Sequence, residues 1–525
     1  MEILRATSEF IDLAAPVSET GDAFDFAVNG HRVWSTRLPP LRDGVVRLDW
    51  PQALQPYLRG HGTLSIAPFG GVPAAAADID FGGGGEPVRL VDRSGRPVVV
   101  DKWGHLGRSL EHEPKGFRDR LLERLTALLE TLEGLGYEVC ATGGTLLGAV
   151  RSGDLLPRDD DADLAVVLPY SHPADVSLAC YELEDRLVAL GHTVVRHSGA
   201  HLQVTFLAAD GSVDQYIDIF CAFFRNGEYC QPFHVRTPLP REAILPFGRV
   251  VLAGLSLPAP ALPEAWLEAC YGPNWQIPDP AFYFDTPWPT RRRYEHWFGL
   301  SQNVNREFWE TAWADELADP DPDPEAGLPQ ETDRRLLLRL IPAGAKVVDV
   351  GCGDGQTALW LARQNRTVVG VDYALSALAL ARRKQSAADL GKVRFEYLNL
   401  NDSRRVLEFA ARRLAESRPW HVVGLHVWES LDERGRSNLL QLISCLVGEA
   451  GCAFGSVFTD GPAAGGGPRT FTASWQEIQA RAPAYDLAMS PLALVETASA
   501  APRRRAVAFA LGRHPVEQLY GKGEP

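Results

Sequence analysis

The chain has 525 residues, of which 45% are hydrophobic and 23% charged, and its formal net charge is −15. This length exceeds what one hydrophobic core usually serves, so we expect about three domains. The acidic balance argues against a general nucleic-acid binder, which needs a basic face. No apolar run is long enough to span a bilayer, and we expect no signal peptide in MEILRATSEFIDLAA. We therefore expect a cytoplasmic protein without a nucleic-acid partner or a transmembrane segment, and leave peripheral membrane association open.

The eight cysteines are scattered and form no C-x-x-C pair. Several, such as Cys140, Cys221 and Cys445, stand among apolar residues. This pattern is typical of buried thiols in a reducing compartment, and it argues against a disulfide framework or a zinc site.

Residues 1–105 have the pattern of strands and turns. The stretch FDFAVNGHRVWSTRL alternates in hydrophobicity on both sides of an Asn-Gly turn signal, and PVRLVDRSGRPVVVDKWG repeats the theme around a Ser-Gly pair. Between them, FGGGGEP predicts a flexible joint. We predict an N-terminal all-β accessory module of sandwich type.

Residues 106–290 combine helical and strand patterns, which predicts a central α+β domain. The stretch GFRDRLLERLTALLETLEGLG has leucines at helical spacing and ends on a glycine cap signal. Strands, a second helix and a Pro-rich β stretch follow. The basic run TRRRY at 290–294 has the composition of a solvated turn between domains.

Residues 291–335 predict a connector, made of a helix over NVNREFWETAWADEL and a stiff Pro/Asp linker, ADPDPDPEAGLPQ. In residues 336–525 strands and helices alternate, which is the pattern of a doubly wound α/β sheet. We therefore expect a multidomain chain that ends in a Rossmann-like α/β domain.

Four aspartates, Asp159, Asp160, Asp161 and Asp163, stand directly before an apolar run. On a strand alternate residues share a face, so we expect Asp159, Asp161 and Asp163 to point together and Asp160 to face away. Carboxylates this close favour a hard divalent cation between them. Asp218, inside the apolar strand QYIDIF, needs a partner or a metal, and an adjacent strand would bring it to the same cation. A solvated acidic turn is the alternative, which the apolar run disfavours.

Upstream of the acids, two glycines precede a helix, and such a turn offers backbone N–H groups to a phosphate. The whole stretch GGTLLGAVRSGDLLPRDDDADLAVV, residues 143–167, resembles the signature of the LicD family, which includes the fukutin-related proteins. The strand YIDIF resembles the family's later acidic strand. A closing segment resembles a further family pattern, carried by Pro258, Leu267, Tyr271, Gly272 and Trp275.

This resemblance implies a nucleotidyltransferase fold and transfer of a phospho-alcohol group from a CDP-activated donor to a glycan hydroxyl. It implies that Asp161, Asp163 and Asp218 are catalytic, with Asp218 either a metal ligand or the base. The implied ligands of Mg²⁺ (or Mn²⁺) are Asp159, Asp161, Asp163 and Asp218, and the implied donor-binding residues are Gly143, Gly144, Thr145 and Arg151. The chain departs from the family pattern at Arg158 and Ala162. Beside the cluster, Arg158 would neutralise charge or touch the donor, which leaves the donor's identity open.

A second motif begins at Lys346, where an apolar strand ends in a glycine-rich turn, KVVDVGCGDG. NAD-binding folds use a similar turn, but the acid two residues before the first glycine makes the stretch similar to motif I of class I S-adenosylmethionine methyltransferases. In that resemblance the acid at the end of the next strand binds the ribose diol, and the stretch FEYLNLND lies near the adenine. The implied cofactor-binding residues are Asp349, Gly351, Gly353, Gly355, Asp372, Asn401 and Asp402. His426 and Glu429 are candidate bases near the methyl acceptor.

Our leading interpretation is a bifunctional enzyme of glycan modification that uses S-adenosylmethionine and Mg²⁺, a nucleotide-activated donor and a glycan acceptor. The alternative is an enzyme that nucleotidylates and methylates a small molecule such as an antibiotic or a sugar. A third interpretation is a binding scaffold in which only the methyltransferase is active.

Overall fold

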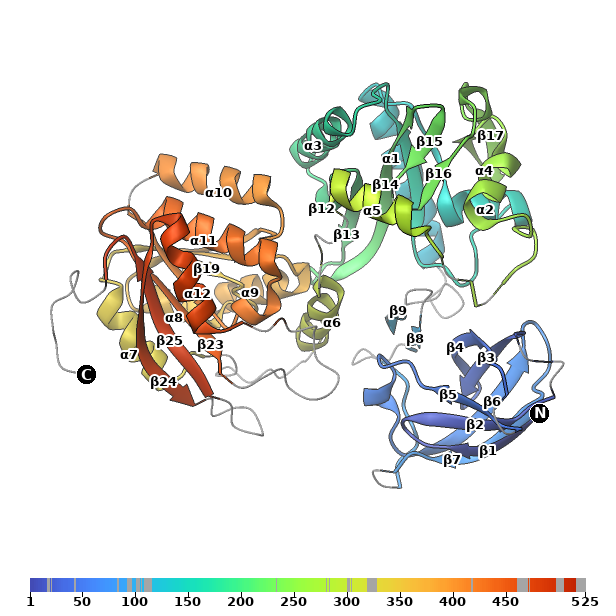
Figure 1. The fold of residues 1–525 in the computed structure, drawn as a ribbon, viewed down its shortest axis with the longest axis horizontal. Helices are drawn as coiled ribbons and strands as arrows, with labels where there is room; N and C mark the ends of the chain where they lie inside the picture. The colour runs from blue at the N-terminus through green and yellow to red at the C-terminus, as the bar shows by residue number, and fades with distance from the viewer. Residues whose placement is uncertain are drawn as a thin grey trace. The chain divides into compact units, whose positions relative to one another are not determined.

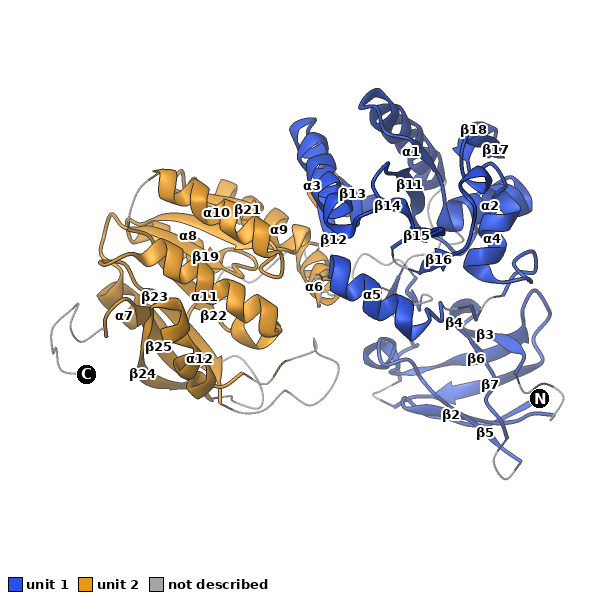
Figure 2. Cartoon of the chain, turned by 45° about the horizontal axis from the view of Figure 1, so that its top comes forward, with its two compact units in different colours: residues 1–206, 214–301 blue, residues 207–213, 302–525 orange. Residues whose placement is uncertain are grey.

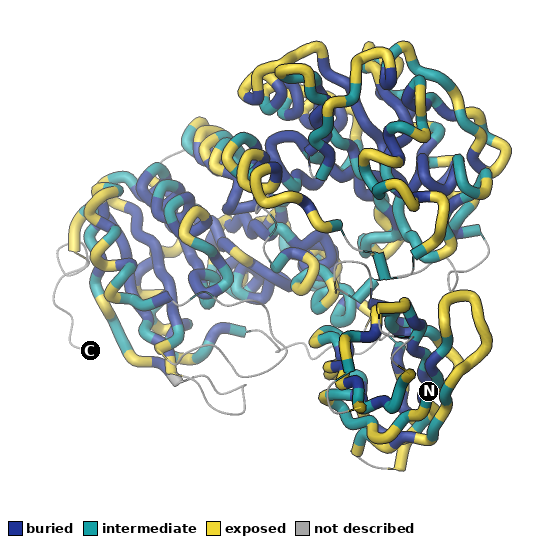
Figure 3. Tube along the Cα trace, turned by 45° about the vertical axis from the view of Figure 1, so that its right-hand side comes forward, coloured by how far each residue is buried: buried dark blue, intermediate teal, exposed yellow. Residues whose placement is uncertain are grey.

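The computed structural model describes residues 1–16, 19, 21–41, 44–82, 85–91, 97–100, 104, 106–107, 116–232, 234–279, 281–282, 284–299, 303, 305–318, 328–416, 419–459, 471, 473–496 and 505–515 (Figure 1). It divides into two compact units, the first formed by residues 1–206 with 214–301 and the second by residues 207–213 with 302–525 (Figure 2). In both units the central strands are the most buried segments, and exposed positions gather on the outer helices and loops (Figure 3). Among the described helices, none combines the length and apolarity needed to cross a bilayer.

Two antiparallel sheets form the N-terminal part of the first unit, with strand orders β1-β2-β5 and β4-β3-β6-β7, and one apolar core lies between them. The strands are β1 (Glu2–Ala6), β2 (Phe10–Ala14), β3 (Ala23–Val28), β4 (His31–Arg37), β5 (Val46–Asp49), β6 (His61–Pro68) and β7 (Ala75–Asp80), followed by the short pair β8 (Val99–Val100) and β9 (Leu106–Gly107). Asn29 and Gly30 form the predicted tight turn, with φ of 51° and 80°. The predicted Ser-Gly turn and part of the glycine joint lie outside the described residues.

A mixed sheet of order β10-β11-β14-β13-β12 forms the centre of the rest of the first unit. Its apolar contacts place α1, α3 and α5 against one face and α2 and α4 against the other. The elements are α1 (Phe117–Gly134), β10 (Val139–Ala141), α2 (Gly143–Ser152), β11 (Ala162–Val167), α3 (Pro173–Ala189), β12 (Thr193–Ser198), β13 (His201–Leu207), β14 (Val213–Arg225), β15 (Glu228–Gln231), β16 (Val235–Thr237), β17 (Gly248–Leu252), β18 (Leu255–Ala259), α4 (Pro263–Tyr271) and α5 (Trp288–Phe298).

The composition of the basic run TRRRY predicted a solvated turn, and this prediction is wrong. The run is part of helix α5. Tyr294 and Phe298 of this helix are buried in the core of the first unit, and the Tyr294 hydroxyl donates a hydrogen bond to the backbone oxygen of Val235 at 2.5 Å. The arginines, residues 291–293, lie between the buried Thr290 and Tyr294, so the run is amphipathic at helical spacing. The prediction considered only the charge of the run and overlooked the apolar residues at helical spacing.

The second unit is a doubly wound sheet of order β21-β20-β19-β22-β23-β25-β24, which confirms the predicted Rossmann-like fold. Core contacts place α7, α8 and α9 on one face and α10, α11 and α12 on the other. The elements are α6 (Arg306–Leu317), α7 (Glu331–Leu340), β19 (Lys346–Val350), α8 (Gln356–Arg363), β20 (Thr367–Asp372), α9 (Leu375–Ala388), β21 (Val393–Tyr397), α10 (Ser403–Glu416), β22 (His421–Leu425), α11 (Glu433–Val447), β23 (Ala453–Phe458), α12 (Trp475–Arg481), β24 (Ala488–Glu496) and β25 (Arg505–Gly512).

Strand β25 lies antiparallel between β23 and β24. The dinucleotide-binding fold has an all-parallel order that continues past the fifth strand without such an insertion. The topology therefore argues against the dehydrogenase alternative that the glycine-rich turn alone left open.

The segment expected to be a connector, residues 291–335, contains most of α5, which belongs to the first unit, and all of α6 and the start of α7, which belong to the second. Helix α6 packs on α9, and the Glu310 carboxylate accepts hydrogen bonds from the backbone N–H groups of Leu375 and Ser376, at 2.7 and 2.8 Å. Most of the predicted Pro/Asp linker lies outside the described residues. All eight cysteines are free, as predicted, and six are buried.

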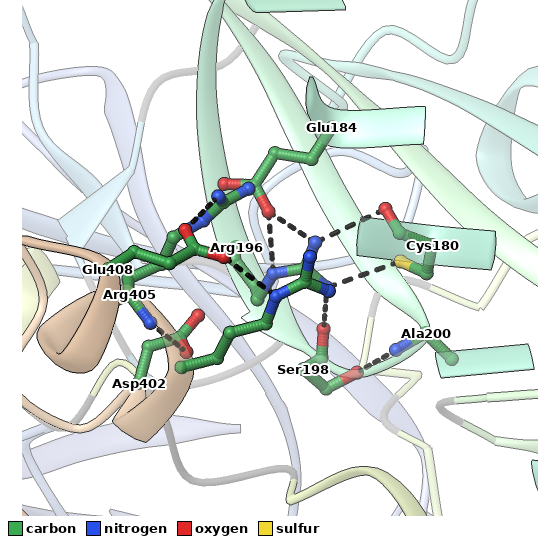
Figure 4. Close-up of polar contacts among 9 residues, drawn as sticks. Cys180, Glu184, Arg196, Ser198, Ala200, Asp402, Arg405 and Glu408 are labelled. Carbon is green, nitrogen blue, oxygen red and sulfur yellow. Dashed lines mark hydrogen bonds and ion pairs between the residues drawn. The ribbon is translucent and has the colours of Figure 1, made fainter. Parts of the chain in front are cut away.

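A buried arginine fixes the β12–β13 hairpin to α3 (Figure 4). The Nε of Arg196 donates to Glu184 Oε2 at 2.8 Å, and its Nη1 donates to Cys180 Sγ and the Ser198 backbone oxygen. The guanidinium also lies over the ring of Tyr181, 3.7 Å from its centroid. Only 3% of Arg196 is exposed, so the ion pair between Arg196 and Glu184 is shielded from water. Its stability therefore depends on these contacts.

We expect Arg196→Met to lower the free energy of unfolding of the first unit by about 3–5 kcal/mol, because it leaves the Glu184 carboxylate buried without its cation. The double variant Arg196→Met/Glu184→Leu should recover most of the loss, since it removes both charges. Urea unfolding followed by circular dichroism measures both effects. A double variant less stable than the single variant would contradict this account.

Candidate active sites

Three carboxylates of the first unit meet where β11 and β14 run side by side. The two strands are parallel, and Asp163 lies opposite Asp218 in their register. Residues paired in this way present side chains to the same face of a sheet. Asp161 joins them, so that one carboxylate oxygen of each residue lies within 4.8 Å of the others. The structure therefore brings together the three acids predicted to be catalytic.

Contrary to our expectation, Asp161 does not lie on a strand. Strand β11 begins at Ala162, so the preceding acids lie on a turn and the alternation of a strand does not apply to them. Asp159 lies near Asp160 and Asp161 instead of joining the three-acid group. We expected Asp160 to face away from the other acids, and it does not. Its Oδ1 accepts a hydrogen bond from the hydroxyl of Tyr216 at 3.4 Å. Burial raises the pKa of Tyr216, and the charge of Asp160 raises it further.

The two glycines that begin α2 give the acids the space they occupy. A Cβ on Gly143 would lie 2.3 Å from Asp163 Oδ2, and one on Gly144 would lie 2.1 Å from Asp159 Oδ2. The N–H of Gly144 donates to Asp163 Oδ2 at 2.6 Å, and the N–H of Asp163 donates to Thr145 Oγ1 at 2.8 Å. The loop expected to bind donor phosphates thus holds a carboxylate at the helix N-terminus, where negative charge is favourable.

The structure gives other partners to the two arginines that we expected beside the acids. The Nε of Arg151 donates to the backbone oxygen of Trp275 at 2.7 Å and so ties α2 to the segment after α4. Arg158 pairs with Asp25 of the N-terminal sheets at 2.7 Å, and its guanidinium lies 4.7 Å from the ring centroid of Phe69. The contact of either arginine with a donor stays a prediction.

An oxygen-only set of three carboxylates suits a hard cation such as Mg²⁺ or Mn²⁺. Asp161, Asp163 and Asp218 therefore fit the metal that the sequence implied. Burial is the largest influence on Asp218 and opposes its ionisation, but the charges and hydrogen bonds of His201, His197 and Gln203 together lower the pKa of this carboxyl.

The second unit contains a cavity of about 240 Å³ at the carboxyl ends of its central strands. Four of the predicted cofactor-binding residues line it, namely Gly351, Gly353, Asp372 and Asn401. The carboxylate of Asp372 accepts hydrogen bonds from the N–H groups of Gly353 and Ala374, at 3.0 and 2.9 Å. An acid at the end of the second strand beside a glycine-rich turn fits the adenosyl group of S-adenosylmethionine.

The other three predicted residues do not line this cavity. Asp349 is buried, and a Cβ on Gly355 would lie 2.6 Å from the Phe395 ring, so this glycine serves the packing of α8 on the sheet. Asp402 Oδ1 accepts from the N–H of Arg405 at 3.1 Å, which makes Asp402 a cap for α10. Of the two candidate bases, His426 lines the cavity and Glu429 does not.

Sequence reasoning missed the aromatic wall of the cavity, formed by Trp309, Trp313 and Tyr373, and also Asn399. The two tryptophans are four residues apart on α6, with ring centroids 6.5 Å apart, and Trp313 contacts the position where Gly353 would carry a Cβ. Their i, i+4 spacing was the available signal. His426 adopts a left-handed backbone conformation (φ 53°) and stacks on Phe458, with ring centroids 4.2 Å apart. Strained conformations of this kind concentrate at functional sites.

Asp349 has an unusual protonation state that leads to a testable pH dependence. Burial raises its pKa to about 8, and the charge of Asp372 contributes to the rise. Because the folded-state pKa lies above the value of an unfolded aspartate, this group's contribution to stability is complete below about pH 4 and is lost as the pH rises through 8. From pH 5 to pH 9 the second unit should therefore lose stability relative to the Asp349→Asn variant.

Differential scanning calorimetry of the full chain measures this difference, and the transition that shifts upward with S-adenosylmethionine identifies the second unit. A constant difference between the wild type and Asp349→Asn across this pH range would show that Asp349 does not titrate as described.

Residues 136–262 match the family described as LicD/FKTN/FKRP, nucleotidyltransferase domain, and residues 347–414 match a methyltransferase domain family. Among curated proteins, the chain is 36% identical over 69 residues to a 2-heptyl-1-hydroxyquinolin-4(1H)-one methyltransferase from Mycobacteroides abscessus. It is 38% identical over 88 residues to the methyltransferase GfsG from Streptomyces halstedii. These matches span 13% and 16% of this chain, and only 30% and 28% of the two relatives.

Solved structures similar to the chain include a SAM-dependent methyltransferase from Anabaena variabilis, at 17% identity and a TM-score of 0.33, over 39% of this chain and 93% of that one. A TehB-like methyltransferase from Corynebacterium glutamicum is 18% identical with a TM-score of 0.26, over 36% of this chain and 91% of that one.

Proposed function

Because the chain joins a LicD-family domain to an S-adenosylmethionine-dependent methyltransferase domain, we propose that it is a bifunctional enzyme of glycan modification. In the proposed first reaction, a phospho-alcohol group passes from a CDP-activated donor to a glycan hydroxyl with Mg²⁺ as cofactor. In the proposed second reaction, a methyl group passes from S-adenosylmethionine to an acceptor. The observation that carries the first assignment is the meeting of Asp161, Asp163 and Asp218 on two parallel strands.

The proposed phosphoryl transfer needs positioning and charge neutralisation more than covalent chemistry. The acceptor oxygen forms a bond to the phosphorus of the phospho-alcohol group, the bond to the CMP oxygen breaks, and the hydroxyl proton passes to a base. A bound Mg²⁺ would neutralise the donor phosphates. Asp163 is held in place by the N–H of Gly144. We propose that Asp218, from the neighbouring strand, binds the cation or accepts the proton.

In the second unit, the cavity supplies a cofactor end and an acceptor end. We assign Asp372 and the glycine-rich turn, which Trp313 of α6 contacts, to the cofactor end, and His426 lines the same cavity. His426 is therefore our candidate for the residue that positions or deprotonates the methyl acceptor.

The same aromatic wall favours a second candidate function, in which the acceptor is a planar small molecule. The relative from Mycobacteroides abscessus is described as a methyltransferase of a hydroxyquinolinone, which has such a ring. In this alternative the first unit transfers a nucleotidyl group from a nucleoside triphosphate, and the second unit methylates the same molecule.

A donor panel distinguishes the two candidates. The full chain is incubated with Mg²⁺, a set of candidate glycans and small-molecule acceptors, and either CDP-alcohols or nucleoside triphosphates. Acceptor-dependent release of CMP from a CDP-alcohol supports phospho-alcohol transfer, and release of pyrophosphate from a triphosphate supports nucleotidylation. The absence of both products, with Mg²⁺ binding also absent in calorimetry, would favour a scaffold in which only the methyltransferase works.

A further inference from the structure

Two histidines of the β12–β13 hairpin lie beside Asp218. A ring nitrogen of His197, a ring nitrogen of His201 and a carboxylate oxygen of Asp218 lie within 4.8 Å of one another. Asp218 also belongs to the three-acid group with Asp161 and Asp163. One carboxylate is therefore common to an oxygen-only group and to a group that offers two imidazoles.

The two imidazoles are held in fixed orientations. The rings of His197 and His201 stack with centroids 4.6 Å apart, and the ring of His201 stacks in turn on Phe220 at 4.3 Å. The Nε2 of His201 is buried and lies 3.3 Å from Asp218 Oδ1. Two ligand atoms at this separation are close enough to be bridged by one cation.

The surroundings of the group are also ordered. The side-chain amide of Gln203 donates to Asp218 Oδ1 at 3.4 Å, which orients the carboxylate from outside the group. Arg196, next to His197 in the chain, fixes the hairpin to α3 through Glu184 and Cys180. Outer contacts that orient ligands in this way are characteristic of metal centres.

We propose that His197, His201 and Asp218 bind a second divalent cation, distinct from the Mg²⁺ expected at the three acids. Two imidazoles and one carboxylate prefer Zn²⁺, Co²⁺ or Mn²⁺ to Mg²⁺, and three protein ligands leave a coordination position open for water or substrate. Binding of this cation depends only on the three residues. Its role as one member of a two-metal pair in phosphoryl transfer rests on the proposed function of the first unit.

The test uses the full chain, freed of metal with a chelator and then kept in excess Mg²⁺. Co²⁺ is titrated, and binding is followed by its visible absorption and by metal analysis after dialysis. We expect one Co²⁺ per chain, displaced by Zn²⁺. His197→Gln and His201→Gln should each weaken Co²⁺ binding by about 100-fold, because loss of an outer contact alone costs about 10–100-fold.

Two further variants make the assignment specific. Asp161→Asn should retain Co²⁺, since Asp161 does not belong to the group formed by His197, His201 and Asp218. His192→Gln removes a histidine just before β12 that belongs to neither group, and it should bind Co²⁺ as the wild type does. Circular dichroism establishes that each variant is folded.

Failure to bind Co²⁺, or equal binding by the wild type and both histidine variants, would overturn the proposal and leave His201 and Asp218 as a metal-free ion pair. This outcome is distinguishable from failure of the proposed function. If no CMP is released in the donor panel and the histidine variants lose Co²⁺ binding, the cation site is supported and the proposed phospho-alcohol transfer is contradicted.

Discussion

Replacing Asp163 with asparagine is expected to lower the rate of CMP release by about 10³-fold, equivalent to about 4 kcal/mol of transition-state stabilisation. Asparagine keeps the shape of the side chain and can still accept from the N–H of Gly144, but it removes the charge that binds the cation. The loss should therefore occur without unfolding. Initial rates of CMP release from a CDP-alcohol, at saturating Mg²⁺, measure it.

The matched control is Asp160→Asn, which removes a neighbouring negative charge outside the three-acid group. Its effect should be below about tenfold, in the range of a single hydrogen bond. Equal losses for Asp160→Asn and Asp163→Asn would mean that the net charge of the turn matters, and not the register of Asp163 against Asp218.

Replacing Asp372 with alanine is expected to weaken binding of S-adenosylmethionine by about 100-fold. The ribose hydroxyls would lose their charged acceptor, and two charge-assisted hydrogen bonds are worth about 1.5 kcal/mol each at the lower end of their range. The change also releases the N–H of Gly353, which Asp372 holds at 3.0 Å. Isothermal titration of the full chain with S-adenosylmethionine gives the affinity.

Asp402→Asn is the informative comparison, because the sequence placed Asp402 in the same site whereas the structure makes it a helix cap. We expect this variant to keep its affinity for S-adenosylmethionine and to lose at most about 1 kcal/mol of stability. A loss of affinity equal to that of Asp372→Ala would show that Asp402 binds the cofactor.

The sequence predicted those parts of both sites that depend on short stretches of chain. The glycines at the start of α2, the acids before β11 and the turn after β19 are local patterns, and each constrains its own backbone. Asp218 was also predicted, because a carboxylate inside an apolar strand needs a partner.

Other features depend on contacts between distant segments and were not predicted. Arg158 pairs with Asp25, 133 residues away in the chain, and Trp313 of α6 contacts the turn at Gly353. The histidines of the β12–β13 hairpin lie beside Asp218 only because β13 lies next to β14 in the sheet. A single sequence contains no local signal for which distant segments meet, because such contacts arise from the order of the strands and the packing of the other elements.

The most direct test of the central claim, that one chain contains two independent transfer sites, is a crossed assay. CMP release and S-adenosylhomocysteine formation are measured on the wild type, Asp163→Asn and Asp372→Ala, with the acceptors found in the donor panel. We predict that Asp163→Asn loses CMP release and retains binding of S-adenosylmethionine, with methyl transfer to a preformed acceptor intact. Asp372→Ala should show the reverse. Loss of both activities in either folded variant, or of neither, would contradict the account.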